Sequence, residues 1–131
     1  MVALLNRLDV AHEAVRSVYV GLQGNVLLPQ TVLVEVAYLV GRDAGIGTVV
    51  AFLRGLPFSK FKLTALTGRD VERVAEILEQ YRDSRVDFVD ATVMAVAERV
   101  MCKTILTLDQ RDFRVFRPRN LGYFDLLPTD V

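Results

Sequence analysis

The sequence contains little of what marks several common classes of protein. It has a single cysteine, Cys102, so no disulfide can form within the chain. Secreted domains of this size usually contain several cysteines, so we expect a reducing, cytoplasmic location. Its 16 basic and 16 acidic residues cancel to a formal net charge of +0, which excludes the broad positive field of sequence-blind nucleic-acid binders. Any site for a polyanion must therefore be local.

Long hydrophobic runs are also absent. The longest apolar stretch, residues 26–40, is interrupted by Pro29, Gln30 and Glu35 and falls short of the roughly 18 apolar residues of a membrane-spanning helix. The N-terminus has neither a basic segment nor a small-residue cleavage site, so no signal peptide is expected. We therefore expect no membrane contact. Because its 131 residues contain no linker or repeat, the chain is predicted to form one domain, 1–131.

Turn residues divide the chain into short apolar strands that alternate with helices. Thr67 with Asp70, and Asp87, have the positions of helix caps, and Asp9 and Thr48 are expected to cap two further helices. The strands are continuously apolar, which is typical of a parallel sheet covered by helices on both faces. The predicted fold class is therefore three-layer α/β/α. Strands are expected at 26–28, 61–66 and 104–108, and helices at 10–21, 31–42, 45–55, after the cap at 67–70, and at 88–100.

One carboxylate lies in an apolar helix. The helical neighbours of Glu35 at three and four residues are apolar or weakly polar, so the sequence offers it no visible partner. An unpaired carboxylate in such surroundings is costly. It must reach solvent, pair with a basic residue or bind a cation.

Four aspartates lie at the ends of predicted elements. Asp87 and Asp90 have the spacing of a helix cap and a first-turn acid, so helix stability alone could explain both. Asp109 directly follows a predicted strand, where either a functional carboxylate or a turn-forming aspartate is expected. Asp112, three residues later, is either a second ligand or loop surface.

These acids are more informative together than singly. In a parallel sheet, functional groups gather beyond the carboxyl ends of the strands, so Glu35, Asp90 and Asp109 are predicted to meet in one crevice. Two carboxylates ~4 Å apart repel by roughly 4 kcal/mol at an effective dielectric constant near 20, so such a cluster calls for a divalent cation. Oxygen ligands suit Mg²⁺ or Mn²⁺, whose bound water can attack a phosphodiester.

Three segments carry a family resemblance. Residues 29–38 (PQTVLVEVAY), 87–99 (DFVDATVMAVAER) and 104–113 (TILTLDQRDF) resemble the acidic motifs of PIN-domain proteins, in particular the VapC-type ribonuclease toxins. The C-terminal segments 113–119 and 124–128 also resemble the end of that subgroup.

The resemblance implies a parallel α/β fold and endoribonuclease activity with Mg²⁺ or Mn²⁺. It assigns catalysis and metal binding to Glu35, Asp90 and Asp109, with Asp87 and Asp112 as auxiliary acids. It also implies that the protein is the toxin of a type II toxin–antitoxin pair, inhibited by a cognate antitoxin and working as a homodimer on an RNA substrate.

The N-terminus departs from the family pattern. Residues 2–6 resemble the helix that follows the family's first strand, whereas that strand and its terminal aspartate are absent from the sequence. Asp9 comes after this helix and does not match. Either this start is internal to a longer natural chain, or the protein has lost that strand and its first metal ligand. For the second case, the alternative hypothesis is a catalytically impaired PIN-like binding or scaffold protein that keeps its antitoxin or dimer contacts.

A local basic stretch follows Asp109. Arg111, Arg114, Arg117 and Arg119 either hold RNA phosphates or form a solvated C-terminal loop. Arg111 and Arg114, the nearest to Asp109, are predicted to bind RNA.

Overall fold

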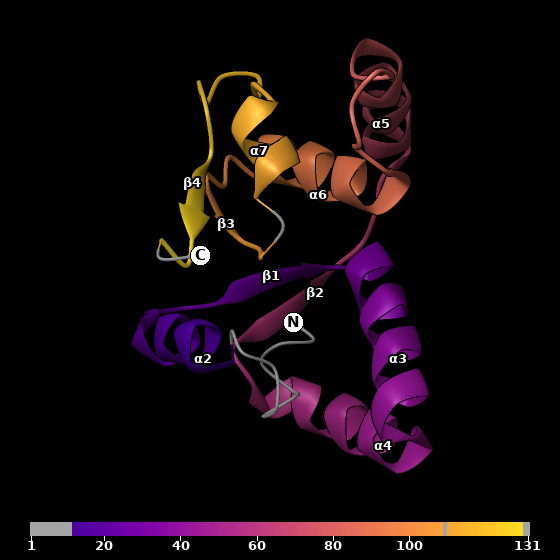
Figure 1. Ribbon diagram of the computed structural model, residues 1–131, viewed down its shortest axis with the longest axis vertical. Helices are drawn as coiled ribbons and strands as arrows, with labels where there is room; N and C mark the ends of the chain where they lie inside the picture. The colour runs from indigo at the N-terminus through magenta and orange to yellow at the C-terminus, as the bar shows by residue number, and fades with distance from the viewer. Residues whose placement is uncertain (1–11, 109, 130–131) are drawn as a thin grey trace. The chain divides into compact units, whose positions relative to one another are not determined.

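The computed structural model describes residues 12–108 and 110–129 and divides the chain into two compact units (Figure 1). Unit 1 is Met1–Ala65 and unit 2 is Leu66–Val131. Asp9, with the helix start that it was predicted to cap, and Asp109 lie outside the described residues. In the described part, no helix is long and apolar enough to cross a membrane. The prediction of a single domain stays a prediction.

Unit 1 is built on two parallel strands. β1 (Val26–Pro29) pairs with β2 (Phe61–Thr64) in a register that opposes Val26 to Phe61. The two strands lie side by side in Figure 1. Because α3 begins directly after β1, the first turn of that helix lies at the carboxyl end of the strand.

A lysine connects β2 to the helix that precedes β1. The Lys60 Nζ donates to the carbonyl oxygens of Tyr19 (2.6 Å), Val20 (3.1 Å) and Leu22 (2.7 Å), at the end of α2 (His12–Gly21). The last carbonyls of a helix have no partner within it and carry partial negative charge, so an ammonium stabilises them.

Two consecutive helices complete unit 1. α3 (Gln30–Ala44) and α4 (Ile46–Gly55) pack on each other through Val36, Val40 and Val49, and the 3-10 helix Leu56–Phe58 follows.

The predicted cap of α4 was wrong, whereas its predicted range, 45–55, agrees with the structure to within one residue. Gly45, at a φ of 86°, is the N-cap, and Thr48 lies inside the helix, where its hydroxyl donates to the carbonyl of Ala44 at 3.1 Å. The positive φ is a conformation that glycine adopts without strain, so the chain can turn from α3 directly into α4, and the helix begins before Thr48.

Unit 2 repeats the pattern of parallel strands with helices. Its elements are α5 (Gly68–Gln80), α6 (Phe88–Arg99), β3 (Thr104–Leu106), α7 (Arg111–Val115) and β4 (Asp125–Leu127). β3 and β4 are parallel, with Thr104 opposite Asp125. The parallel pairing and the intervening helices in both units confirm the predicted α/β class, whereas α7 and β4 were not predicted.

The core of unit 2 lies between its helices and the C-terminal segment. Ile77 on α5, Met94 on α6 and Phe116 after α7 are fully buried. Phe116 stacks on Phe124 with the ring centroids 5.9 Å apart and an interplanar angle of 22°. Such aromatic pairs add stabilisation beyond their buried area, so the segment after α7 is fixed to the core.

An ion pair beside this core joins α5 to α6. The Arg73 Nε and Nη2 donate to Glu98 Oε1 and Oε2 at 2.7 and 3.0 Å, and the side chains are only 13% and 8% exposed. Glu98 Oε2 also accepts from the backbone N–H of Arg119 at 2.8 Å. The hydrogen bond from Arg73 to Glu98 keeps the pKa of Arg73 above its ordinary value. One carboxylate therefore connects two helices and the C-terminal segment.

The start of α5 confirms the predicted capping box. Thr67 Oγ1 accepts from the backbone N–H of Asp70 at 3.2 Å, and Asp70 Oδ2 accepts from the N–H of Thr67 at 2.9 Å. Arg99 Nε donates to both Asp70 oxygens, at 3.0 and 3.1 Å. Burial alone would raise the pKa of Asp70, but the hydrogen bonds from Thr67 and Arg99 lower it overall. The ionised carboxylate therefore stabilises the folded chain.

We expect Asp70→Asn to lower the free energy of unfolding by about 1 to 2 kcal/mol at neutral pH. Because the folded-state pKa lies below the ordinary value of 3.8, this stabilisation is present above that value and is lost as the pH falls through the lower folded-state pKa. Urea unfolding from pH 7 to pH 3 checks this against Asp83→Asn, an exposed control. A constant difference between wild type and Asp70→Asn down to pH 3 would contradict the assignment.

Candidate functional site

Glu35 lies in the first half of α3 in unit 1, and its side chain is exposed. No ion pair or hydrogen bond joins its carboxylate to any other residue that the structure describes. The sequence left three possibilities for this charge: exposure to solvent, a basic partner or a bound cation. The structure shows exposure to solvent, which leaves the carboxylate oxygens available to a ligand.

Asp87 and Asp90 mark the start of α6. Asp87 is the N-cap, and its Oδ1 accepts from the backbone N–H of Asp90 at 2.9 Å, as the spacing predicted. Asp90 lies in the first turn of α6 and is half-buried. The next two residues in the sequence, Ala91 and Thr92, are buried. Backbone N–H groups at a helix start favour a negative charge, so α6 both positions and stabilises the Asp90 carboxylate.

The segment after β3 carries the other two acids. The backbone N–H of Thr107 donates to the carbonyl of Leu127 at 2.9 Å, which extends the β3–β4 pairing toward Asp109. Asp109 itself lies outside the described residues, and Asp112 is in the first turn of α7. Thr107 therefore lies at the carboxyl end of β3, the end at which the sequence predicts a functional carboxylate.

Asp112 is buried, with 6% of the residue exposed. The expectation that it lies on a loop surface is wrong, because α7 packs it inward beside the buried Phe113. No described residue donates a hydrogen bond or forms an ion pair with its carboxylate. Because no described side-chain oxygen is both fully buried and without a hydrogen-bond partner, the carboxylate oxygens of Asp112 keep some exposure, where a ligand can reach them.

The described acids do not form a complete metal centre by themselves. Within 12–108 and 110–129, no three histidine, cysteine, aspartate or glutamate side chains are grouped so that they could hold an ion. The predicted ligand set includes Asp109 and consists only of carboxylates. Its oxygen donors have the chemistry that Mg²⁺ and Mn²⁺ prefer, so the donor types fit such an ion.

The four arginines after Asp109 have different surroundings. Arg117 Nη1 donates to the carbonyls of residues 114 to 116, and Arg119 donates its Nη2 to Glu76 and its backbone N–H to Glu98, so both hold the fold of unit 2. Arg111 and Arg114 are exposed, and neither pairs with Asp112 or Asp125 among the described contacts. The Arg114 Nη2 donates to Gln110 Oε1 at 2.8 Å, and the other N–H groups of Arg114, with those of Arg111, are available to an external anion.

Gln110 is a residue of this segment that the sequence did not single out. It is 6% exposed, and its side-chain amide bonds to Pro128, which is 18 residues away in the chain. No local pattern marks such a long-range contact, so nothing in the sequence around Gln110 distinguished it from an ordinary polar loop residue.

Comparison with known proteins gives three results. A family model described as "PIN domain" matches residues 1–117. A curated protein, "Ribonuclease VapC26" from Mycobacterium tuberculosis (strain ATCC 25618 / H37Rv), is 33% identical over an alignment of 129 residues that covers 96% of each chain. The crystal structure of Mycobacterium tuberculosis VapC20, described as a "Sarcin-Ricin loop cleaving toxin", superposes with a TM-score of 0.76 at 24% identity, covering 84% of this chain and 85% of the other, and shows that the fold is shared.

Proposed function

This chain belongs to the PIN-domain family of VapC-type proteins, and we propose that it is a metal-dependent endoribonuclease, the toxin of a type II toxin–antitoxin pair, acting in the cytoplasm. The observation that carries the proposal is similarity to a ribonuclease along nearly the whole of both chains. The acids of the three motifs, Glu35, Asp90 and Asp109, are all present in the sequence. The reaction is hydrolysis of an RNA phosphodiester.

We assign metal binding to Asp90 and Asp109, with Glu35 contacting the ion directly or through water and with Asp87 and Asp112 as auxiliary acids. The position of Asp90 in the first turn of α6 and the carboxylate of Asp112, which accepts no hydrogen bond from a described residue, support this assignment. Mg²⁺ or Mn²⁺, when bound, would lower the pKa of a water molecule and screen the charge of the phosphate. The carboxylates also provide acceptors for the proton of the attacking water.

Arg111 and Arg114 are proposed to position RNA. Both are exposed residues of α7, on either side of Asp112 in the sequence, and a guanidinium binds phosphate through two parallel hydrogen bonds. Phosphate contacts fix the register of the RNA without reading its sequence, so they would bind the backbone beside the reacting phosphodiester.

Changing Arg111 and Arg114 together to glutamine is expected to weaken RNA binding at low salt. The salt dependence should fall by about 0.7 units of slope per lost contact on single-stranded RNA. Titration in a chelator prevents cleavage during the measurement. The matched control changes the exposed Arg82 and Arg85 to glutamine and should keep the wild-type slope. A wild-type slope in the first variant, or a drop in melting temperature as its main effect, would show that these arginines do not hold phosphates.

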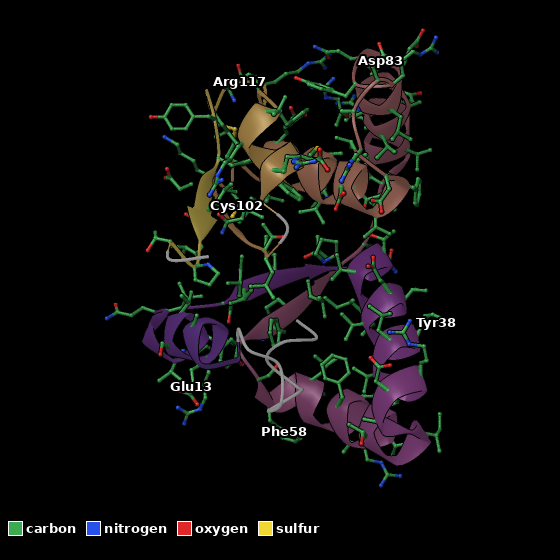
Figure 2. The ribbon with its side chains drawn as sticks, viewed as in Figure 1. Glu13, Tyr38, Phe58, Asp83, Cys102 and Arg117 are labelled. Carbon is green, nitrogen blue, oxygen red and sulfur yellow. The ribbon has the colours of Figure 1, made fainter. Side chains whose placement is uncertain are left out.

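Protein partners are the second part of the proposal, a cognate antitoxin and a second copy of the chain. Unit 1 exposes Val34 (71%) and Tyr38 (68%) four residues apart on α3, and Figure 2 shows Tyr38 pointing away from that helix. Ile46 on α4 and Phe58 after it are also exposed. Large exposed apolar side chains on one helix face are typical of surfaces that bind other proteins.

The test is cleavage of a single-stranded RNA by the purified chain. We expect cleavage with Mg²⁺ or Mn²⁺, none after chelation by EDTA, and recovery when the ion is added back. A folded chain that cleaves no RNA with either ion would favour the alternative, a PIN-like protein that binds partners without catalysis.

A further inference from the structure

One buried side chain connects the acid-bearing segment of unit 2 to the end of β4. The Gln110 Nε2 donates to the carbonyl of Pro128 at 2.9 Å and to that of Thr107 at 3.2 Å. Gln110 is also the N-cap residue of α7, and its own side chain makes no capping bond. Its amide nitrogen therefore links three parts of the chain: the end of β4, the segment after β3 and the start of α7.

The other end of the same amide reaches a proposed RNA contact. Gln110 Oε1 accepts from Arg114 Nη2 at 2.8 Å. Arg114 is exposed, so this bond restricts a long side chain that would otherwise sample many rotamers in solvent. The hydrogen bond leaves the remaining N–H groups of the guanidinium free to meet an anion.

We propose that Gln110 is a positioning residue, which fixes the start of α7, the helix that carries Asp112, against the end of β4 and orients Arg114 toward the RNA backbone. Gln110 is covalently bonded to Asp109 and lies two residues before Asp112. The inference rests on the proposed function, because it assigns Gln110 a role toward the metal ligands and the RNA of that site.

The chemistry of the residue explains why glutamine suits this position. An amide supplies two donor hydrogens and an acceptor oxygen, and here two donor contacts and one acceptor contact are made. Glutamate would lose both donor contacts, and methionine, of similar length, would lose all three. Asparagine keeps the groups but is shorter by one methylene, so it cannot span the same partners.

The first measurement is Mn²⁺ affinity by calorimetry, at a temperature where circular dichroism shows every variant folded. We expect Gln110→Met to bind Mn²⁺ about tenfold more weakly, because residues that orient metal ligands typically contribute 10- to 100-fold to affinity. Gln80→Met, an exposed change on α5, is the matched control and should bind as the wild type does. If Gln110→Met does not fold, Gln110→Asn replaces it, with a several-fold loss expected.

The second measurement is RNA affinity in a chelator for Gln110→Met, Arg114→Gln and the double variant. Because Gln110 acts on RNA through Arg114, the double variant should bind no more weakly than Arg114→Gln alone. Folded Gln110 variants with wild-type affinity for Mn²⁺ and for RNA, even at a lower melting temperature, would overturn this inference alone. A wild-type chain that binds no Mn²⁺ would overturn the proposed function and, with it, the role of Gln110.

Discussion

Changing Asp90 and Asp109 together to asparagine is expected to weaken Mn²⁺ binding by at least about 100-fold. Loss of a residue that only orients a ligand costs 10- to 100-fold, so loss of two ligands should cost no less. An ion that binds only the folded state raises the free energy of unfolding by mass action. The increase is about 2.7 kcal/mol at an ion concentration 100 times the dissociation constant. Saturating Mn²⁺ should therefore raise the melting temperature of the wild type and leave that of the double variant unchanged.

The control for this variant removes the same charge elsewhere in unit 2. Asp83→Asn with Asp125→Asn changes two exposed aspartates, and Figure 2 labels Asp83 in the turn after α5. This control should respond to Mn²⁺ as the wild type does. Equal Mn²⁺ affinities in the double variant at 90 and 109 and in the wild type would contradict the assignment of these carboxylates.

Removing the Glu98 side chain is expected to have the largest effect on stability. Glu98→Ala leaves the poorly exposed Arg73 guanidinium without its main partner and the backbone N–H of Arg119 without an acceptor. Breaking a buried pair on one side costs about 3 kcal/mol, which corresponds to a fall in melting temperature of roughly 10 °C. Urea unfolding and a thermal melt measure both quantities.

The comparison for this change is Glu79→Ala, on the exposed side of α5. It removes one carboxylate from the same unit and should alter the free energy of unfolding by less than about 0.5 kcal/mol. If the two variants were equally stable, the Arg73–Glu98 pair would not be what joins α5, α6 and the C-terminal segment.

Features that depend on neighbouring residues could be predicted from the sequence. The capping box of Thr67 and Asp70 and the N-cap at Asp87 are confirmed, because a cap is formed by residues two or three positions apart. The strands at β1, β2 and β3 are also found within one to two residues of their expected positions, because continuously apolar segments between turn residues are distinctive.

Features that depend on distant residues could not be predicted. α7 has five residues and begins without a side-chain cap, so it gives no helix start signal. β4 has three residues, too few for an apolar pattern. It is a strand because its backbone pairs with that of β3, which is distant in the sequence. Thr48 has the composition of a cap, but the positive φ of Gly45 moves the start of α4 ahead of it.

The candidate site was predicted in part. Residue type and position within an element identified Asp90 as a first-turn acid, and α6 confirms that placement. The burial of Asp112 follows from the packing of α7, and the long-range contact of Gln110 from the nearby end of β4, and the sequence revealed neither. The sequence also could not separate the arginines that hold the fold, Arg117 and Arg119, from those left exposed.

The most direct test of the central claim is single-turnover cleavage of a labelled single-stranded RNA by Asp90→Asn, beside the wild type and Asp83→Asn. All three proteins are compared in Mn²⁺, with equal folded fractions verified by circular dichroism. We expect the wild type and Asp83→Asn to cleave at the same rate and Asp90→Asn to cleave at least about 100-fold more slowly. Cleavage by Asp90→Asn at the wild-type rate would contradict the claim that this chain is a nuclease whose carboxylates hold a catalytic metal ion.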